Sequence, residues 1–154
     1  MAERGKDSLI VIMFTPDYVV GLTDGEGSFT VYLKDPASGT PRNRRVRAEP
    51  KFFLKLIEKD KIVLDGLRKF FGCGSVYFQK DVRKNHQHCY RYEVGNRQDI
   101  AQKIIPFFRA HPLRFPSKAK DFQIFCDIFD RIMRNEHATD DGLKNLRSIK
   151  AGMH

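Results

Sequence analysis

Apolar and polar positions along the chain follow two different periods, and the switches between them divide the sequence into helices and strands. Residues 15–26 predict a helix, because Thr15 suits the N-cap and Pro16 suits the first helical position. From residue 27 to residue 34 the pattern becomes a strict alternation of apolar and polar side chains, which predicts a strand. The helix therefore passes into the strand without a loop.

The remaining elements follow the same two periods. Further strands are predicted at about 44–57, 75–82 and 88–94, and further helices at about 62–71, 100–108 and 117–134, with a short terminal helix from Thr139. Gly72 closes the second helix, and the region from Pro106 to Pro112 is expected to stop the third. Pro50 predicts an edge position or a bulge in the second strand. The order αββαββα predicts an α+β fold with one four-stranded antiparallel sheet.

Side chains of the predicted strands divide sharply between an apolar face and a polar face. Any half-buried sheet has a polar outer face. This one is crowded with Arg, Lys, Gln and Glu, which pair with base edges and phosphates in the major groove of DNA. The candidate DNA-binding residues are Ser28, Thr30, Tyr32, Lys34, Arg42, Arg44, Arg45, Arg47, Glu49, Lys51, Lys55, Ser75, Tyr77, Gln79, Asp81, Arg83, Arg91 and Glu93.

Length and charge are consistent with a nucleic-acid partner. The 154 residues carry 28 Lys and Arg against 19 Asp and Glu, a net charge of +9, and such a basic surface favours polyanions. We expect one domain, with an N-terminal tail at 1–14 and a helical C-terminal tail at 135–154. An anionic membrane is the rival partner, but the basic residues cluster in strand-like stretches rather than on an amphipathic helix. The apolar run 9–14 is too short to span a bilayer and resembles no signal peptide.

Cysteine usage indicates a reducing, intracellular compartment, whether a prokaryotic cytoplasm or an organelle. Three cysteines are scattered along the chain without a Cys-x-x-Cys pair, so neither a disulfide framework nor a zinc ribbon is expected. The run from His86 to Cys89 could suggest a metal site. On a strand, however, His86 and His88 would share one face while Cys89 points to the other, which disfavours zinc there.

The end of the first helix carries the most informative residues of the chain. Gly21 and Gly25 lie four residues apart on one helical face, so another backbone could approach closely there. Glu26 stands between Gly25 and Gly27 at the exit of the helix. A carboxylate in this position, beside a face of small residues, suits a metal site shared across an interface. The simpler alternative is a structural turn with a solvated Glu26.

Residues 19–27, Val-Val-Gly-Leu-Thr-Asp-Gly-Glu-Gly, resemble the LAGLIDADG motif of homing endonucleases and intron maturases. Weaker similarities follow in the order of that family: Pro50-Lys51-Phe52 before Glu58-Lys59-Asp60, then 71–76, His111-Pro112-Leu113 and 118–122. A lone Gly-x-Gly would favour the structural turn, whereas this ordered series favours the family.

The resemblance implies roles for particular residues. Single-motif members of the family act as homodimers, which implies an interface of Val20, Gly21, Thr23, Asp24 and Gly25 around a twofold axis. It implies Glu26 as a metal ligand with Gly25 beside it, in place of the Asp that is commonest there. Asp24 matches the family's first acidic position, which implies a structural role for Asp24 more than a role as a metal ligand. Glu58 stands where the family often has Gln, which orients water. Lys118 matches the family's basic residue near the scissile phosphate, and Lys120 is the alternative.

The implied function is a site-specific, intron-encoded endonuclease that cuts both strands of a long pseudo-palindromic DNA site. The implied cofactor is Mg²⁺, with Mn²⁺ or Ca²⁺ able to substitute in binding. The alternative is a maturase that acts on its own intron RNA, or a regulator of the same fold that binds DNA without cleaving it. Retention of a carboxylate at 26 with a lysine at 118 favours cleavage, since a pure binder gains nothing from acidic charge beside phosphate. A metal phosphodiesterase of another fold would need further clusters of Asp or His residues. We find none in the sequence, which disfavours this third possibility.

Overall fold

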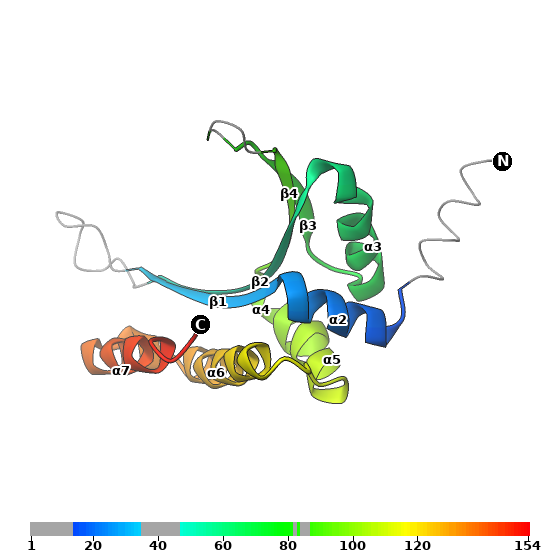
Figure 1. The fold of residues 1–154 in the computed structure, drawn as a ribbon. Helices are drawn as coiled ribbons and strands as arrows, with labels where there is room; N and C mark the ends of the chain where they lie inside the picture. Colours follow the sequence, from blue (N-terminus) through cyan, green and yellow to red (C-terminus); the bar gives the residue numbers. More distant parts are fainter. Residues whose placement is uncertain (1–13, 35–46, 82, 84–86) are drawn as a thin grey trace.

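The fold is a curved four-stranded antiparallel sheet with all its helices on one side (Figure 1). The computed structural model describes residues 14–34, 47–81, 83 and 87–154. The strands are β1 (Gly27–Lys34), β2 (Arg47–Ile57), β3 (Ser75–Gln79) and β4 (Cys89–Val94), in the spatial order β1-β2-β4-β3. The concave side of the sheet is left uncovered by helices (Figure 1). The predicted α+β fold class is therefore confirmed.

Helix α2 (Pro16–Glu26) passes directly into β1, as the sequence predicts. The Thr15 hydroxyl accepts a hydrogen bond from the Tyr18 backbone N–H, and Pro16 occupies the first turn. Gly27 is required at the junction, because a Cβ there would lie 2.6 Å from Thr23 Cγ2 and 2.8 Å from the Thr23 carbonyl oxygen. The junction thus fixes the position of Glu26 relative to the sheet.

The core lies between the apolar face of the sheet and the helices. Phe29 of β1 and Phe52 of β2 are paired across the strands, and their ring centroids are 5.1 Å apart. Phe108 packs edge-on against Phe29 at 5.4 Å and against Phe52 at 5.5 Å, and Phe125 meets Phe29 at 5.5 Å. These aromatic pairs, which are nearly excluded from solvent, hold α5 (Ile105–Ala110) and α6 (Pro116–Met133) against the sheet.

The remaining helical elements are α3 (Lys61–Phe71), α4 (Arg97–Asp99), the π-helical η2 (Ile100–Ile104), α5 (Ile105–Ala110), α6 (Pro116–Met133) and α7 (Asp140–Lys150), with short 3-10 turns η1 (Glu58–Asp60) and η3 (Glu136–Ala138). Gly72 caps α3 with a left-handed φ of 68°, as expected. Thr139 caps α7 through its side chain. Within the described residues, no helix is both long and apolar enough to cross a membrane.

The third predicted helix ends at Ala110, within the region from Pro106 to Pro112 as predicted, although Pro106 itself lies inside the helix. Elements α4, η2 and α5 follow one another without a break, and Pro106 lies in the first turn of α5. The Ile105 backbone N–H donates to the Ile100 carbonyl five residues earlier. The wider π turn accommodates a residue that has no N–H and whose ring would clash with a carbonyl of a regular preceding turn.

Pro50 lies in an inner strand, but at a point where that strand has only one neighbour. β2 pairs with β1 from Arg47 onward, whereas its pairing with β4 begins only at Phe52. The Ala48 carbonyl accepts a hydrogen bond from Arg97 Nη2 at 2.8 Å on the side away from β1, and Pro50 faces the same side two residues on. Residues 47–51 of β2 therefore form a local free edge, which pairs with β1 but not with β4. Pro50, which has no N–H, lies at this local free edge and not at a bulge.

The third strand is shorter than predicted. β3 ends at Gln79, so Asp81 and Arg83 lie after the strand and not on it. Phe78, on the side expected to be buried, is 46% exposed, because few residues cover this edge of the sheet. The predicted start of β2 at about residue 44 lies outside the described residues.

Candidate active site and DNA-facing surface

Glu26 is presented to solvent at the last position of α2. Its side chain is exposed, and within the described part of the chain its carboxylate takes part in no hydrogen bond or ion pair. Gly25 before it is also exposed, while Gly27 after it is buried in the helix–strand junction. A carboxylate that the protomer itself does not use remains available for a cation or a second protein copy.

Lys118, in the first turn of α6, reaches the same point. Its ammonium group donates a hydrogen bond to the backbone carbonyl of Gly27, the residue that follows Glu26. Lys118 is half-buried, whereas Lys120 is exposed and lies on a different side of α6. Of the two lysines proposed from sequence, Lys118 is therefore the one that the fold brings next to Glu26.

Glu58 lies at the start of η1, directly after β2, and is exposed. Its backbone N–H donates to the His88 carbonyl at 3.0 Å, which ties the turn to β4. Within the described residues its carboxylate has no protein partner. The structure thus leaves Glu58 free to act on water or substrate but shows no direct link between Glu58 and Glu26.

The predicted interface residues of α2 separate into two groups. Val20, Thr23 and Asp24 are buried within the protomer, at 3%, 0% and 4% exposure. Gly21 and Gly25 are exposed, and a Cβ built on either glycine meets nothing within 4 Å. The open face of α2 therefore consists of the glycines and the partly exposed Tyr18 and Leu22, and the other three side chains support the protomer's own core.

Asp24 anchors the helix that carries Lys118. Its carboxylate accepts hydrogen bonds from the backbone N–H groups of Arg114 (3.1 and 3.2 Å) and Phe115 (3.1 Å), which immediately precede α6. These groups would otherwise be without a partner at the beginning of the helix. The spacing of the two acidic residues is thereby explained physically: Asp24 orients α6, and Glu26 is presented to solvent.

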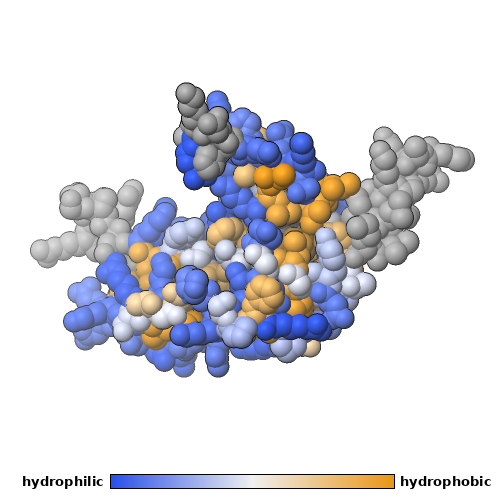
Figure 2. All heavy atoms as spheres, in the orientation of Figure 1, coloured by the Kyte–Doolittle hydropathy of each residue, from blue (hydrophilic) through white to orange (hydrophobic). Residues whose placement is uncertain are grey.

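Apolar surface lies close to this exposed helical face. Figure 2 shows hydrophobic residues gathered over α3 and beside α2, while hydrophilic residues cover much of the remaining visible surface. Ile62 of α3 is 52% exposed and Tyr18 of α2 is 37% exposed. Exposed apolar groups around an open face of small residues are typical of an interaction surface.

The polar face of the sheet is the uncovered concave side. Ser28, Thr30 and Tyr32 of β1 are half-buried and alternate with buried Phe29 and Val31, as predicted. The other candidates described on the strands keep the same side: Lys34, Arg47, Glu49, Lys51, Lys55, Ser75, Tyr77, Gln79, Arg91 and Glu93. Arg42, Arg44 and Arg45 lie outside the described residues. The sheet thus presents a nearly continuous polar surface.

At the centre of this surface the side chains contact one another across three strands. Glu93 Oε1 is 2.8 Å from Arg91 Nη2, and Glu93 Oε2 accepts a hydrogen bond from Lys51 Nζ at 3.1 Å. The Tyr77 hydroxyl donates to Glu93 Oε1 at 3.3 Å. Burial raises the pKa of Tyr77, with the carboxylate of Glu93 acting in the same direction. The phenol therefore remains a donor at neutral pH.

At the edge of β1 the C-terminal helix adds a basic residue that the sequence did not indicate. A cavity of about 420 Å³ is lined by Tyr32, Lys118, Asp121 and Lys150, among others. Lys150 Nζ lies 6.0 Å from the centroid of the Tyr32 ring. The His154 backbone N–H donates to Asp121 at 2.8 Å and fixes the tail there. Only the folded arrangement of α6 and α7 places Lys150 beside the sheet.

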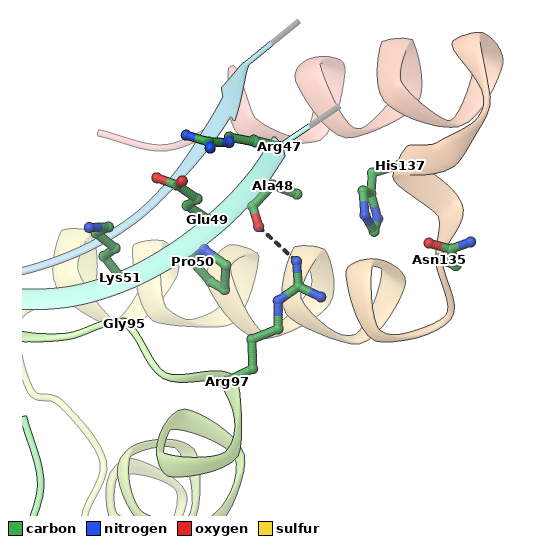
Figure 3. Close-up of a pocket in the computed structure, with 9 residues that line it drawn as sticks. All are labelled: Arg47, Ala48, Glu49, Pro50, Lys51, Gly95, Arg97, Asn135 and His137. Carbon is green, nitrogen blue, oxygen red and sulfur yellow. Dashed lines mark hydrogen bonds between the residues drawn. The ribbon is translucent and has the colours of Figure 1, made fainter. Parts of the chain in front are cut away.

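A larger cavity of about 630 Å³ lies at the local free edge of β2 (Figure 3). Arg47, Glu49 and Lys51 point to the polar side of the strand, while Arg97 approaches from the other side and binds the Ala48 carbonyl (Figure 3). Arg97 supplies the hydrogen bond that the Ala48 carbonyl does not receive from a neighbouring strand. The cavity is thus a consequence of the early end of β4.

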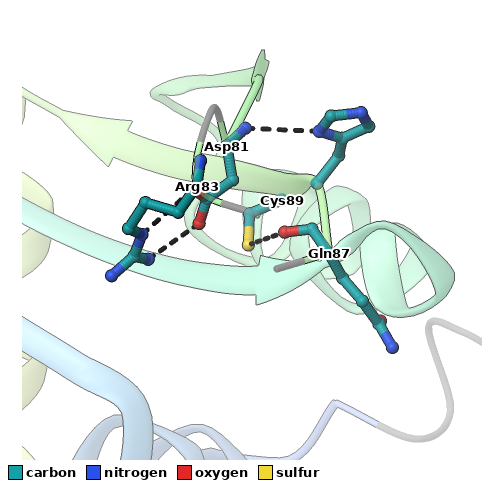
Figure 4. A network of polar contacts seen from close by, with 5 residues as sticks. Asp81, Arg83, Gln87 and Cys89 are labelled. Carbon is teal, nitrogen blue, oxygen red and sulfur yellow. Dashed lines mark hydrogen bonds and ion pairs between the residues drawn. The ribbon is translucent and has the colours of Figure 1, made fainter. Parts of the chain in front are cut away.

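In the turn between β3 and β4, the described polar groups bond to one another. Asp81 pairs with Arg83 at 2.7 Å, and the Cys89 thiol donates to the Gln87 carbonyl (Figure 4). The ring of His88 accepts a hydrogen bond from the Asp81 backbone N–H. His86 lies outside the described residues. Within the described part of the chain, no group of three or more His, Cys, Asp or Glu residues could hold a metal ion.

Comparisons with known proteins agree with this fold. The family model described as LAGLIDADG endonuclease matches residues 19–129. A protein named probable intron-encoded DNA endonuclease 1, from Mycosarcoma maydis, is 32% identical over 108 residues, covering 70% of this chain and 34% of that protein. The chain therefore spans about a third of this curated relative.

Solved structures show the same architecture. The homing endonuclease I-TnaI superposes with a TM-score of 0.75 and 36% identity, covering 92% of this chain and 88% of that one. I-SmaMI, solved with cleaved DNA, superposes with a TM-score of 0.77 and 30% identity, covering 91% of this chain and 44% of that one. Another I-SmaMI structure holds uncleaved DNA in the presence of calcium ions. The fold is that of a homing endonuclease, and the chain belongs to the LAGLIDADG endonuclease family.

Proposed function

We propose that this protein is a site-specific DNA endonuclease that acts as a homodimer with Mg²⁺, cutting one phosphodiester in each strand of a long pseudo-palindromic site. One observation carries the proposal: the Lys118 ammonium is held at the Gly27 carbonyl, directly beside the exposed Glu26. A cation and an unused carboxylate at one point are the groups that phosphodiester hydrolysis requires.

The donor chemistry fits a divalent cation. Carboxylate and carbonyl oxygens are the ligands that Mg²⁺ and Ca²⁺ prefer, and Glu26 with the adjacent Gly25 would supply them. Each protomer offers only this one motif carboxylate at the exposed end of α2, so a full ligand set calls for Glu26 of a second copy. A bound cation would supply an activated water and neutralise the leaving oxygen. The calcium in a relative's complex with uncleaved DNA supports a cation-assisted site.

Dimerisation is the second part of the proposal. Packing α2 against its copy would cover the open face at Gly21 and Gly25 and bring the two Glu26 side chains near the twofold axis. Two carboxylates in such proximity repel each other unless cations lie between them. A symmetric pair of curved sheets would then follow two half-sites of the same DNA duplex.

In this mechanism the residues of the chain have separate tasks. The polar face of the sheet binds and orients the duplex, so that the scissile phosphate lies at the end of α2. Lys118 places positive charge beside that phosphate and stabilises the charge that develops during cleavage. Glu58, which is exposed at the start of η1, would orient a water molecule. The intron-encoded origin follows from the name of the curated relative and is part of the proposal.

The direct test is incubation of the protein with plasmids that carry candidate intron-insertion sites, with Mg²⁺ or with EDTA. We expect double-strand cleavage at one site with Mg²⁺ and none with EDTA. Specific binding without cleavage under both conditions would favour a DNA-binding regulator instead. Stimulation of intron RNA splicing without DNA cleavage would favour a maturase.

A further inference from the structure

Glu93 is an acidic residue at the centre of a surface that is proposed to bind a polyanion. It lies opposite Phe53 of β2 and opposite Ser75 of β3. Its side chain is only 18% exposed. A carboxylate facing phosphates weakens binding by repulsion, so its presence needs a compensating role.

The carboxylate holds one donor from each of the three strands around it. Lys51 comes from β2, Arg91 from β4 itself and Tyr77 from β3, at 3.1, 2.8 and 3.3 Å. All three belong to the predicted DNA-binding set. The side chains of Lys51 and Arg91 are only 25% and 13% exposed, so both long chains are held in place instead of moving freely in solvent.

Arg91 is fixed from a second direction. Its guanidinium carbon lies over the face of the Phe53 ring, 3.5 Å from the ring centroid. This contact and the contact with Glu93 together leave few rotamers to the side chain. A preorganised guanidinium loses less entropy when it binds a base edge and tolerates a wrong base less well.

We propose that Glu93 is a positioning residue that sets the sequence specificity of the sheet. It holds Arg91, and with it Lys51 and Tyr77, in one arrangement, and it lowers the net charge of the centre of the sheet. The expected consequence is weaker non-specific binding together with stronger discrimination between bases. The inference rests on the proposed DNA-binding function.

The test compares wild type, Glu93→Gln, Arg91→Ala and the double variant. Wild-type protein first selects its preferred duplex from a randomised library. Affinities are then measured on that duplex, on its single-base variants and on generic duplex DNA at two salt concentrations. Thermal unfolding shows whether each variant is folded. If Glu93→Gln does not fold, Tyr77→Phe takes its place, because it removes one hydrogen-bond donor to Glu93 and keeps the aromatic ring and the net charge.

We expect Glu93→Gln to bind generic duplex more tightly, with up to about one more counterion released on binding, as measured from the salt dependence of the affinity. We also expect its discrimination between bases to fall about tenfold at one or two positions. In the Arg91→Ala background this loss should disappear, because the carboxylate acts through the arginine. Tyr77→Phe should give a smaller loss at the same positions.

Unchanged discrimination by Glu93→Gln, or by Tyr77→Phe where that variant replaces it, would overturn the inference. A loss of equal size in the Arg91→Ala background would also overturn it, because Glu93 would then read the base itself. If wild type selects no sequence and does not bind duplex DNA, the proposed function fails and the inference fails with it. A wild type that selects a site while the variants behave as wild type refutes the positioning role alone.

Discussion

The ammonium group of Lys118 contacts the carbonyl of Gly27, although the two residues lie 91 positions apart in the chain. This contact joins the beginning of α6 to the junction between α2 and β1. It places a positive charge at the backbone of the residue that follows Glu26, whose exposed carboxylate ends α2. The catalytic proposal depends on this relationship, because neither group alone can hydrolyse a phosphodiester.

The first prediction separates the two candidate lysines. Lys118→Met should lower the cleavage rate by about 100-fold or more, because a charge next to the scissile phosphate is lost. Lys120→Met should have a much smaller effect, since its side chain is exposed on another side of α6. Single-turnover cleavage of a plasmid substrate measures both. A larger loss for Lys120→Met would reassign the role.

The second prediction concerns Asp24. Asp24→Asn should lower the free energy of unfolding by about 1–3 kcal/mol, because a buried carboxylate accepts the backbone N–H groups of Arg114 and Phe115. The matched control is Asp17→Asn on the same helix. Its side chain is 84% exposed and meets Arg114 at 3.5 Å, so a change within about 0.5 kcal/mol is expected. Urea unfolding measures both, and equal effects would contradict the anchoring role.

The third prediction tests the dimer. Gly21→Leu should prevent association of two copies, because a bulky side chain cannot fit where two helical backbones meet. The variant protomer should keep its fold, since a Cβ at this position meets nothing within 4 Å. Sedimentation of both proteins, with thermal unfolding as the control, measures this. A dimer that persists in Gly21→Leu, or a monomeric wild type on DNA, is incompatible with the interface.

The fourth prediction concerns the reading of DNA by β2. Arg47 is exposed on the polar face, two residues from Glu49 along the strand. If Arg47 reads a base, Arg47→Ala should cost about 1–3 kcal/mol at one position and relax preference there. A phosphate contact would instead weaken binding evenly and make the salt dependence shallower. Measurement on single-base variants at two salt concentrations separates these results, and no change in either quantity would exclude Arg47 from recognition.

Much of the fold could be predicted because its signals are local. Thr15, Pro16 and the change of period at Gly27 define α2 and β1, and Gly72 defines the end of α3. The end of α5 at Ala110 lies within the predicted stop region, whereas the π turn that accommodates Pro106 inside the helix has no clear sequence signature. β3 was predicted too long because alternation continues past Gln79, where the strand has already ended.

The candidate site was only partly predictable, because its key relationships are non-local. The motif itself identifies Glu26, but the choice between Lys118 and Lys120 depends on which side of α6 faces Gly27. Lys150 was missed because only the packing of α7 brings it to Tyr32. The predicted polar face was correct in its composition, yet alternation cannot show that Glu93 holds Arg91 and Lys51 together.

The central claim is that Glu26 serves cleavage and not DNA binding. The most direct measurement compares wild type with Glu26→Gln on the same target duplex, recording cleavage with Mg²⁺ and binding with Ca²⁺. Gln has nearly the same shape but is a poor ligand for a hard cation. The account predicts that cleavage is abolished while specific binding is retained. Cleavage by Glu26→Gln at the wild-type rate would contradict it.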